Sequence, residues 1–188
     1  MNRRNALKAL SLATGGVLTA SALSWSGCKT EPTVFRFFKP EDTKTLDQIG
    51  ETILPKTEDS PGAGEIGISE FMDIYAADCL KPSHQTALRN AYSQFLSDIQ
   101  TQYGDDFVAL EALQQHDILL ALDQEAVVYN QSLAPKQPPH FFSILKNMVL
   151  FGYFSSEAGA QQALRYLPIP GGYQGDFPFQ QGDKAWAL

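Results

Sequence analysis

The segment from Ile68 to Cys79 reads ISEFMDIYAADC, and its apolar side chains recur at helical spacing. The apolar positions i, i+3, i+4, i+7 and i+11 are Ile68, Phe71, Met72, Tyr75 and Cys79. Side chains at these positions share one face of an α-helix, and the segment is therefore predicted to be a helix that buries this face. An unpaired cysteine on such a face usually behaves as a small hydrophobe, and we expect Cys79 to be buried and unreactive.

The same periodicity extends along most of the chain. It predicts further helices over residues 41–54, 84–103, 107–122, 141–151 and 156–164. No run alternates apolar and polar residues between turn signals, and no strand is expected. We therefore predict an all-α fold: an irregular, compact domain of about five or six helices with Pro/Gly-rich loops and an irregular C-terminal tail.

Residues that start or stop helices mark several of these boundaries. Ser83 is expected to cap the helix that follows it, and Gly104 is expected to end that helix. Asp105 or Asp106 is expected to cap the next helix, which would carry Leu113 on its apolar face.

Segments rich in proline interrupt the predicted helices. Residues 55–64, PKTEDSPGAG, are predicted to form a loop with defined turns, and residues 131–139, QSLAPKQPP, a second break. The tail from Tyr166 combines prolines and glycines with aromatic residues, which excludes regular structure. It is too apolar for a flexible linker, and we expect it to lie against another surface.

The overall composition bounds the number of domains and the kind of partner. The chain has 188 residues, of which 44% are hydrophobic, enough for one compact core. It contains 14 Lys and Arg against 21 Asp and Glu, for a formal net charge of −7. Nonspecific nucleic-acid binding needs a basic face, and nucleic acid is therefore not expected as a partner.

The N-terminal segment has the pattern of an export signal. Residues 1–8 are basic, with adjacent Arg3 and Arg4, and residues 9–25 carry no charge. This layout predicts a secretory signal over residues 1–27, and its paired arginines resemble a twin-arginine translocation signal, an address read on folded cargo. A membrane-spanning anchor is the alternative, but a span needs about 20 apolar residues, and the uncharged stretch is shorter and includes Ser, Thr and Gly.

The signal has two alternative C-terminal ends, and each has a different consequence for the mature protein. The sequence ASA at residues 20–22 fits ordinary cleavage, which would leave a soluble periplasmic protein. The sequence SGC at residues 26–28 resembles the end of a lipoprotein signal, and a lipid on Cys28 would anchor the protein at a membrane. Trp25 stands where such signals usually have an aliphatic residue. Both alternatives describe an exported protein.

Residues 28–40 are interpreted as a tether, and residues 41–188 as the domain. The tether contains Phe35, Phe37 and Phe38, which would be a liability if they were exposed to solvent. We expect them to pack on the domain or against a partner, and packing on the domain is the commoner case.

Residue types that carry chemistry are sparse and scattered. His84, His116 and His140 lie more than twenty residues apart, and none belongs to a metal-binding motif. His116 and Asp117 could serve as a base and its orienting partner, but no motif marks a nucleophile. The glycines of residues 62–67 follow a predicted helix rather than a strand, which is not the setting of a dinucleotide site. We therefore expect no catalytic, metal or cofactor site in this chain.

Five motifs occur in an order that matches a known family. They are TILPKT at residues 52–57, SPGA at 60–63, a helix carrying Phe71 and Asp78-Cys79, FGYFSS at 151–156 followed by Gly159, and YLPIPG at 166–171. In this order they resemble the gluconate 2-dehydrogenase subunit 3 family, over roughly residues 45–187 and together with the twin-arginine leader.

The resemblance implies a function and a partner. Members of this family are small exported companions of membrane-associated flavin dehydrogenases, whose large subunit carries FAD and oxidises a sugar, a sugar acid or a related alcohol. By this resemblance the chain is a non-catalytic accessory subunit without a cofactor of its own. It would help the flavoprotein subunit to fold and to pass through the twin-arginine export machinery. Membrane association would come through a lipid on Cys28 or through the partner.

Eight residues are interpreted as positions whose backbone or aromatic surface sets the docking face for the partner. They are Pro55, Pro61, Gly62, Phe151, Tyr153, Phe154, Pro170 and Gly171. The alternative for each is that it only shapes a turn or fills the core. Two other functions also stay open: a free-standing periplasmic or lipid-anchored binding protein with an aromatic pocket, and an independent enzyme that uses His116 and Asp117.

Overall fold

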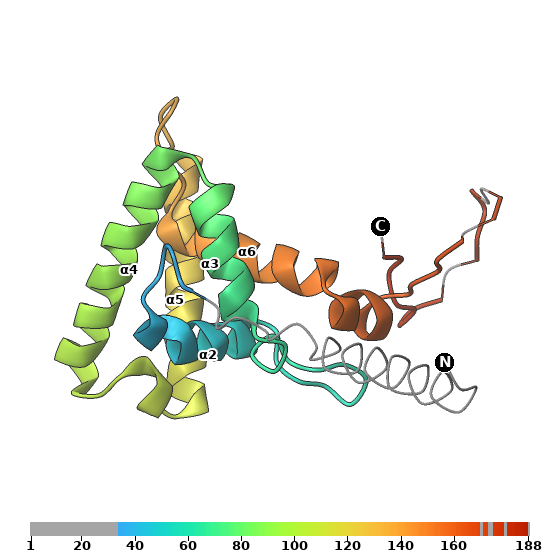
Figure 1. The fold of residues 1–188 in the computed structure, drawn as a ribbon, viewed down its shortest axis with the longest axis horizontal. Coiled ribbons are helices and arrows are strands. Elements are labelled where there is room, and N and C mark those ends of the chain that lie inside the picture. Colours follow the sequence, from blue (N-terminus) through green and yellow to red (C-terminus); the bar gives the residue numbers. More distant parts are fainter. Residues whose placement is uncertain (1–33, 170, 173–174, 179, 188) are drawn as a thin grey trace, which may run out of the picture. The chain divides into compact units, whose positions relative to one another are not determined.

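Helices make up most of the part of the chain that the structure describes (Figure 1). The computed structural model describes residues 34–169, 171–172, 175–178 and 180–187. Its elements are η1 (Pro40–Asp42), α2 (Thr43–Ile53), α3 (Ile68–Asp78), α4 (Pro82–Tyr103), η2 (Phe107–Ala109), α5 (Ala112–Gln131), α6 (Phe141–Ser155) and the π-helix η3 (Gly159–Ala163). The described residues contain no strand, only an isolated bridge between Arg165 and Trp186. The predicted all-α fold is confirmed.

The core is built around α6. In Figure 1, α3, α4 and α5 stand upright and α6 crosses them, and α6 contacts these three helices as well as α2. Its buried residues lie on several sides of the helix, as expected for a helix surrounded by others. They are Phe142, Ile144, Leu145, Met148, Val149, Gly152 and Tyr153. Each large apolar side chain buried in this way contributes about 1.5–3 kcal/mol, and α6 supplies more of them than any other described helix.

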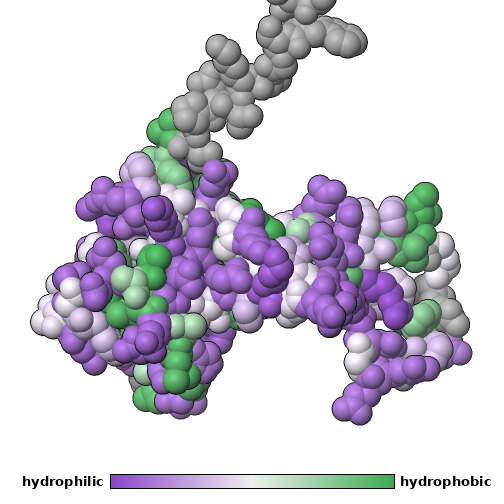
Figure 2. Space-filling view, turned by 90° about the horizontal axis from the view of Figure 1, so that it is seen from below, coloured by the Kyte–Doolittle hydropathy of each residue, from purple (hydrophilic) through white to green (hydrophobic). Residues whose placement is uncertain are grey.

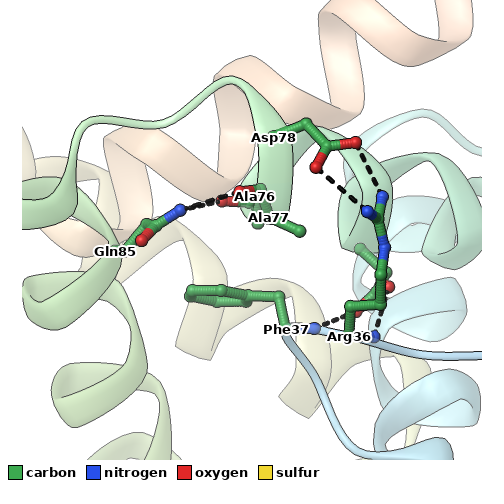
Figure 3. Close-up of polar contacts among 7 residues, drawn as sticks. Arg36, Phe37, Ala76, Ala77, Asp78 and Gln85 are labelled. Atoms are coloured by element: carbon green, nitrogen blue, oxygen red, sulfur yellow. Dashed lines mark hydrogen bonds and ion pairs between the residues drawn. The ribbon is translucent and has the colours of Figure 1, made fainter.

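The segment before η1 is part of this core. Asp73 on α3 is completely buried, and its carboxylate accepts hydrogen bonds from the backbone N–H groups of Arg36, Phe37 and Phe38, each at 2.8 Å. The Arg36 guanidinium donates two hydrogen bonds to the exposed Asp78 carboxylate, at 2.7 and 3.1 Å (Figure 3), and this hydrogen bonding raises the pKa of Arg36. Of the two sequence expectations for the tether aromatics, packing on the domain is the one observed.

Helix ends explain two corrections to the sequence predictions. The helix that begins at Ile68 ends at Asp78, and Cys79 follows as its C-cap and is exposed rather than buried. Gln85 at the start of α4 donates to the carbonyls of Ala76 and Ala77 at 2.9 and 3.0 Å (Figure 3), which satisfies the end of α3.

The cap of α4 also differs from the prediction. Lys81, not Ser83, is the N-cap of α4, because Pro82 takes the first turn, where its missing N–H costs nothing. Gly104 ends α4 as predicted: it has a φ of 77°, and its N–H bonds the carbonyl of Gln100 at 3.0 Å.

The helix predicted over 107–122 is divided. Asp106 caps only the short η2, and α5 starts at Ala112 with a capping box between Glu111 and Gln114. Leu113, predicted on the apolar face, is 70% exposed. The buried face of α5 contains a polar residue instead.

Gln115 is that buried polar residue. Its side-chain nitrogen donates to the carbonyls of Phe107 and Leu110 at 2.9 and 3.1 Å, and its oxygen accepts from Gln48 on α2 at 2.9 Å. Every polar atom of the Gln115 side chain is therefore engaged, as burial requires. The bonds fix the turn at η2 against both α2 and α5.

Candidate functional site

The loop over residues 55–64 is held by one carboxylate. Glu51 in the last turn of α2 accepts hydrogen bonds from the N–H groups of Lys56 and Gly64, at 2.9 and 3.1 Å. The Ala63 N–H donates to the carbonyl of Leu54 at 2.9 Å, which closes the loop at its base. The predicted loop with defined turns is thus an ordered structure.

Gly62 is buried where the loop passes this carboxylate. A Cβ atom at Gly62 would overlap the Glu51 carboxylate, and only glycine leaves room for the contact. A glycine-rich loop that binds a dinucleotide leaves its N–H groups free for phosphate. Here a negative side chain already takes the Gly64 N–H, which is therefore not free for a phosphate.

Tyr153 connects this loop to α6. Its hydroxyl donates to the carbonyl of Pro61 at 2.7 Å, across 92 residues of sequence. Next to it, Gly152 lets α3 approach α6 closely, since a Cβ there would overlap Phe71 and lie 2.7 Å from Ile68. The motifs at residues 60–63 and 151–156, far apart in sequence, therefore form one structure.

Two aromatic side chains of α6 are exposed beside this connection. Phe151 is 56% exposed and Phe154 37% exposed. Phe151 packs against Phe71 and Tyr75 of α3, with ring centroids 5.8 and 5.6 Å apart. A hollow of about 490 Å³ lies next to it, lined by residues of α3, α4 and α6 that include Tyr75 and His84. We call Pro55, Phe151 and Phe154, supported by Gly62 and Tyr153, the loop–α6 surface.

The docking residues predicted from sequence have different environments. Pro55, Phe151, Phe154 and Gly171 are exposed, Pro61 is half-buried, and Gly62 and Tyr153 are buried. Buried Gly62 and Tyr153 shape the surface from below rather than present side chains to a partner. Pro170 lies outside the described residues, as do Arg3, Arg4 and Cys28 of the predicted signal and lipidation site.

Sequence reasoning missed Glu51 as the residue that organises the loop. Its position shortly before a Pro/Gly-rich segment was the available signal, because a carboxylate near several glycines can accept their N–H groups. Phe71 was noted as a core residue, and the structure shows that it also supports the exposed Phe151.

The C-terminal segment makes contacts with itself. The Arg165 guanidinium lies over the rings of Trp186 and Phe177, at 4.8 and 5.5 Å from their centroids. The backbone N–H of Arg165 donates to the carbonyl of Ala185 at 2.7 Å. Ile169, which follows Arg165 in the sequence, is 84% exposed. The tail thus packs partly on itself, and its packing against another surface stays a prediction.

Groups that could do chemistry are dispersed over the described residues. In the pair noted from the sequence, His116 Nδ1 and Asp117 Oδ1 are 3.4 Å apart, and both side chains are exposed. No group of three or more His, Cys, Asp or Glu is placed to hold a metal ion within the described ranges. Burial raises the pKa of Tyr92. Its hydroxyl lies in the core and has no hydrogen-bond partner among the described residues.

None of the helices in the described segments combines the length and apolar character needed to cross a bilayer.

Comparison with known proteins gives one match. A family model described as gluconate 2-dehydrogenase subunit 3 matches residues 40–171, from the first residue of η1 to the end of the YLPIPG motif. All five motifs quoted above lie inside the match. No curated protein and no solved structure matches the chain.

Proposed function

The chain belongs to the gluconate 2-dehydrogenase subunit 3 family, and from this membership we propose that it is the non-catalytic small subunit of an exported, FAD-dependent dehydrogenase. The large partner subunit holds FAD and oxidises a sugar, a sugar acid or a related alcohol. The small subunit binds this partner, assists its folding and accompanies it through the twin-arginine export machinery. The complex resides in the periplasm, either in solution or at a membrane through Cys28 or the partner.

The observation that carries this proposal is the rigid construction of the loop–α6 surface. Exposed Phe151 and Phe154 would be costly in a free monomer, and exposed aromatic side chains are enriched where proteins associate. The loop beside them is fixed by Glu51 and by the hydroxyl of Tyr153. A surface that is ordered before binding loses little entropy on association, which suits it to docking a large subunit.

Export of a complex agrees with the N-terminal sequence. A twin-arginine signal is an address read on folded proteins, and the paired Arg3 and Arg4 can serve a partner bound to the same domain. A subunit with this task needs a docking surface and a signal, and it needs no reaction centre.

The proposal is tested by purifying the tagged full-length protein from its native membranes. We expect a large flavoprotein to co-purify in near-stoichiometric amount, identified by mass spectrometry and by the flavin absorbance of the eluate. A protein that elutes alone and colourless under gentle conditions would contradict a stable complex.

A charge variant tests the surface itself. In the double variant Phe151→Glu and Phe154→Glu, the recovered flavin absorbance should fall at least about tenfold, because two aromatic anchors are replaced by charges. Val127 and Val128 of α5 are exposed to a similar degree, 52% and 68%, and Val127→Glu with Val128→Glu is the matched control. Equal recovery from both variants would place the docking site elsewhere.

The hollow beside Phe151 supports a second candidate, a free-standing binding protein. Its volume of about 490 Å³ falls in the range of small-molecule sites, and its lining combines Tyr75, Phe151 and Met148 with the polar His84 and Asn147. Native mass spectrometry of the purified chain distinguishes the two functions. A bound small molecule together with no flavoprotein would favour this candidate.

A further inference from the structure

A second apolar hollow lies between α4 and α5. This groove has a volume of about 560 Å³, and both helices contribute to its walls. Its floor consists of buried or half-buried apolar side chains, chiefly Phe95, Ile99, Ile118, Leu122 and Phe141. In Figure 2, which keeps left and right as in Figure 1, hydrophobic residues surrounded by hydrophilic ones are visible over the end of the molecule where α4 and α5 lie.

α5 has few partners along this groove. Only Gln115, Leu119 and Ala126 are buried among its 20 residues. Ile118 and Leu122 on the groove side remain half-buried, although both are apolar. In helix-in-groove recognition, an amphipathic helix binds between two neighbouring helices and covers their exposed apolar side chains. The incompletely covered side chains of α4 and α5 form such a groove.

Carboxylates border the apolar floor. Asp98 on α4 and Asp117 and Glu125 on α5 are exposed and line the groove. Among the described residues, none of these three carboxylates pairs with a Lys or Arg.

The charge imbalance extends beyond the groove. Residues 90–135 contain seven Asp or Glu and no Lys or Arg. Within the described segments, only Asp123 of the seven is paired with a Lys or Arg, by the 2.8 Å contact with Lys146 of α6. The groove therefore combines an apolar floor with carboxylates that pair with no Lys or Arg of the described residues. The basic side chains next to them are two histidines: His116 Nδ1 lies 3.4 Å from Asp117 Oδ1, and His140 Nε2 lies 3.7 Å from Glu125 Oε1.

We propose that the α4–α5 groove binds an amphipathic helix whose apolar face is flanked by Lys or Arg, presented by the dehydrogenase subunit that the chain accompanies. The apolar face would cover the floor, and the cations would meet Asp98, Asp117 and Glu125. This charge complementarity disfavours a second copy of the chain as occupant, because its net charge is −7. The identity of the presenting protein rests on the proposed function, whereas the chemistry of the groove rests on its own residues.

A synthetic helix tests the chemistry without the partner. The probe is a fluorescent peptide of about 18 residues, composed of leucine on one face and lysine on the other. Its control has the same composition in an order that distributes leucine around the helix. Fluorescence anisotropy with the full-length protein should show at least about tenfold tighter binding of the amphipathic peptide. Equal binding of both peptides, or no binding, would overturn the proposal.

Charge reversal locates the binding. The triple variant Asp98→Lys, Asp117→Lys and Glu125→Lys should bind the amphipathic peptide at least about tenfold more weakly, because three attractive contacts become repulsive. The matched control reverses three exposed carboxylates outside both the groove and the loop–α6 surface, in Glu41→Lys, Glu70→Lys and Asp176→Lys, with the same change in net charge. An equal loss of binding in the two variants would show a general charge effect and contradict a site in the groove. Circular dichroism verifies that both variants are folded.

Co-purification separates this proposal from the proposed function. If the wild-type protein recovers the flavoprotein but the peptide fails to bind, the accessory function stands and the groove proposal falls. If the peptide binds in the groove and no flavoprotein is recovered, the assignment of the helix to a dehydrogenase subunit falls. If both succeed, a lower recovery of flavoprotein by the groove variant than by its control identifies the complex as the source of the helix.

Discussion

The loop–α6 surface and the α4–α5 groove both expose apolar side chains, but their backbones are held in different ways. Around the first, side chains clamp the chain: Glu51 binds the loop, Tyr153 binds Pro61, and Asp73 binds residues 36–38. Along the second, two long regular helices leave a half-covered apolar floor between acidic side chains. In the clamped region, side-chain hydrogen bonds hold irregular backbone in place. The groove needs no such side chains, because the backbone hydrogen bonds of α4 and α5 are made within each helix. Mutations of the clamping side chains Glu51, Asp73 and Tyr153 should therefore lower stability, whereas mutations of the carboxylates at the groove should change binding with little effect on stability.

The largest loss of stability is expected for Asp73→Ala. The substitution leaves three backbone N–H groups in the interior without their shared acceptor, and the free energy of unfolding should fall by about 3 kcal/mol or more. Urea denaturation followed by circular dichroism measures the change. Asp78→Ala, also on α3, removes the exposed partner of Arg36 and should lower the free energy of unfolding far less, because exposed ion pairs contribute little to stability. Similar losses in both variants would contradict the role of Asp73 as a buried clamp.

A loss of about 2 kcal/mol is expected for Gly152→Val, because the added side chain overpacks the contact between α6 and α3. The same denaturation measurement applies. Gly172→Val is the control, since a Cβ at Gly172 meets no atom within 4 Å, and it should leave the unfolding free energy nearly unchanged. If Gly152→Val were as stable as its control, the two helices would not depend on this close approach.

Removal of the hydroxyl in Tyr153→Phe should cost about 1 kcal/mol, the usual net value of one hydrogen bond. Its local effect is more informative, since the loop loses its connection to α6. Hydrogen exchange should become faster at the N–H groups of Ala63 and Gly64, with little change in α4. Tyr75→Phe is the control, because no hydrogen bond of its hydroxyl is present among the described contacts. Unchanged exchange in the loop would show that Glu51 alone fixes it.

The smallest effect is expected in the groove. The triple reversal of Asp98, Asp117 and Glu125 to Lys should change the unfolding free energy by no more than about 1 kcal/mol, since these side chains are exposed and removed from the core. Reduced repulsion within the acidic segment favours a slight gain at low salt that disappears at high salt. A loss comparable with that of Asp73→Ala would mean that the groove residues support the fold, which would remove the contrast between the two regions.

Helical periodicity predicted the fold class because apolar residues recur at helical spacing in most of these helices, whether a helix buries one face or, like α6, several. The helix that begins at Ile68, the long helix ending at Gly104 and the helix over 141–151 were all placed by it. Periodicity did not predict the buried face of α5. Its apolar residues lie on more than one side of the helix, and their spacing alone does not show which side meets the core. Leu113 was therefore predicted to face inward and is exposed, while polar Gln115 is buried.

Polar contacts between residues far apart in the sequence were also not predicted. Glu51 and Asp73 read as ordinary surface carboxylates in the sequence, and their roles depend on backbone N–H groups 13 and about 36 residues away. Such partners are set by how helices pack, which no local pattern encodes. The aromatic motif at 151–156 was predicted as a docking element, and the structure shows which of its rings face solvent, Phe151 and Phe154, and which supports the loop, Tyr153.

If Cys28 carries a lipid, the hydrogen bonds of Asp73 to residues 36–38 limit the distance between the domain and the bilayer. Residues 36–38 are fixed to α3, and Arg36, the first of them, lies eight positions after Cys28. A fully extended chain spans at most about 3.6 Å per residue, and a lipid on Cys28 would therefore keep Arg36 within about 30 Å of the headgroups. A lipid-anchored subunit would therefore stay within a thin layer next to the membrane, and a dehydrogenase docked to it would be confined to the same layer.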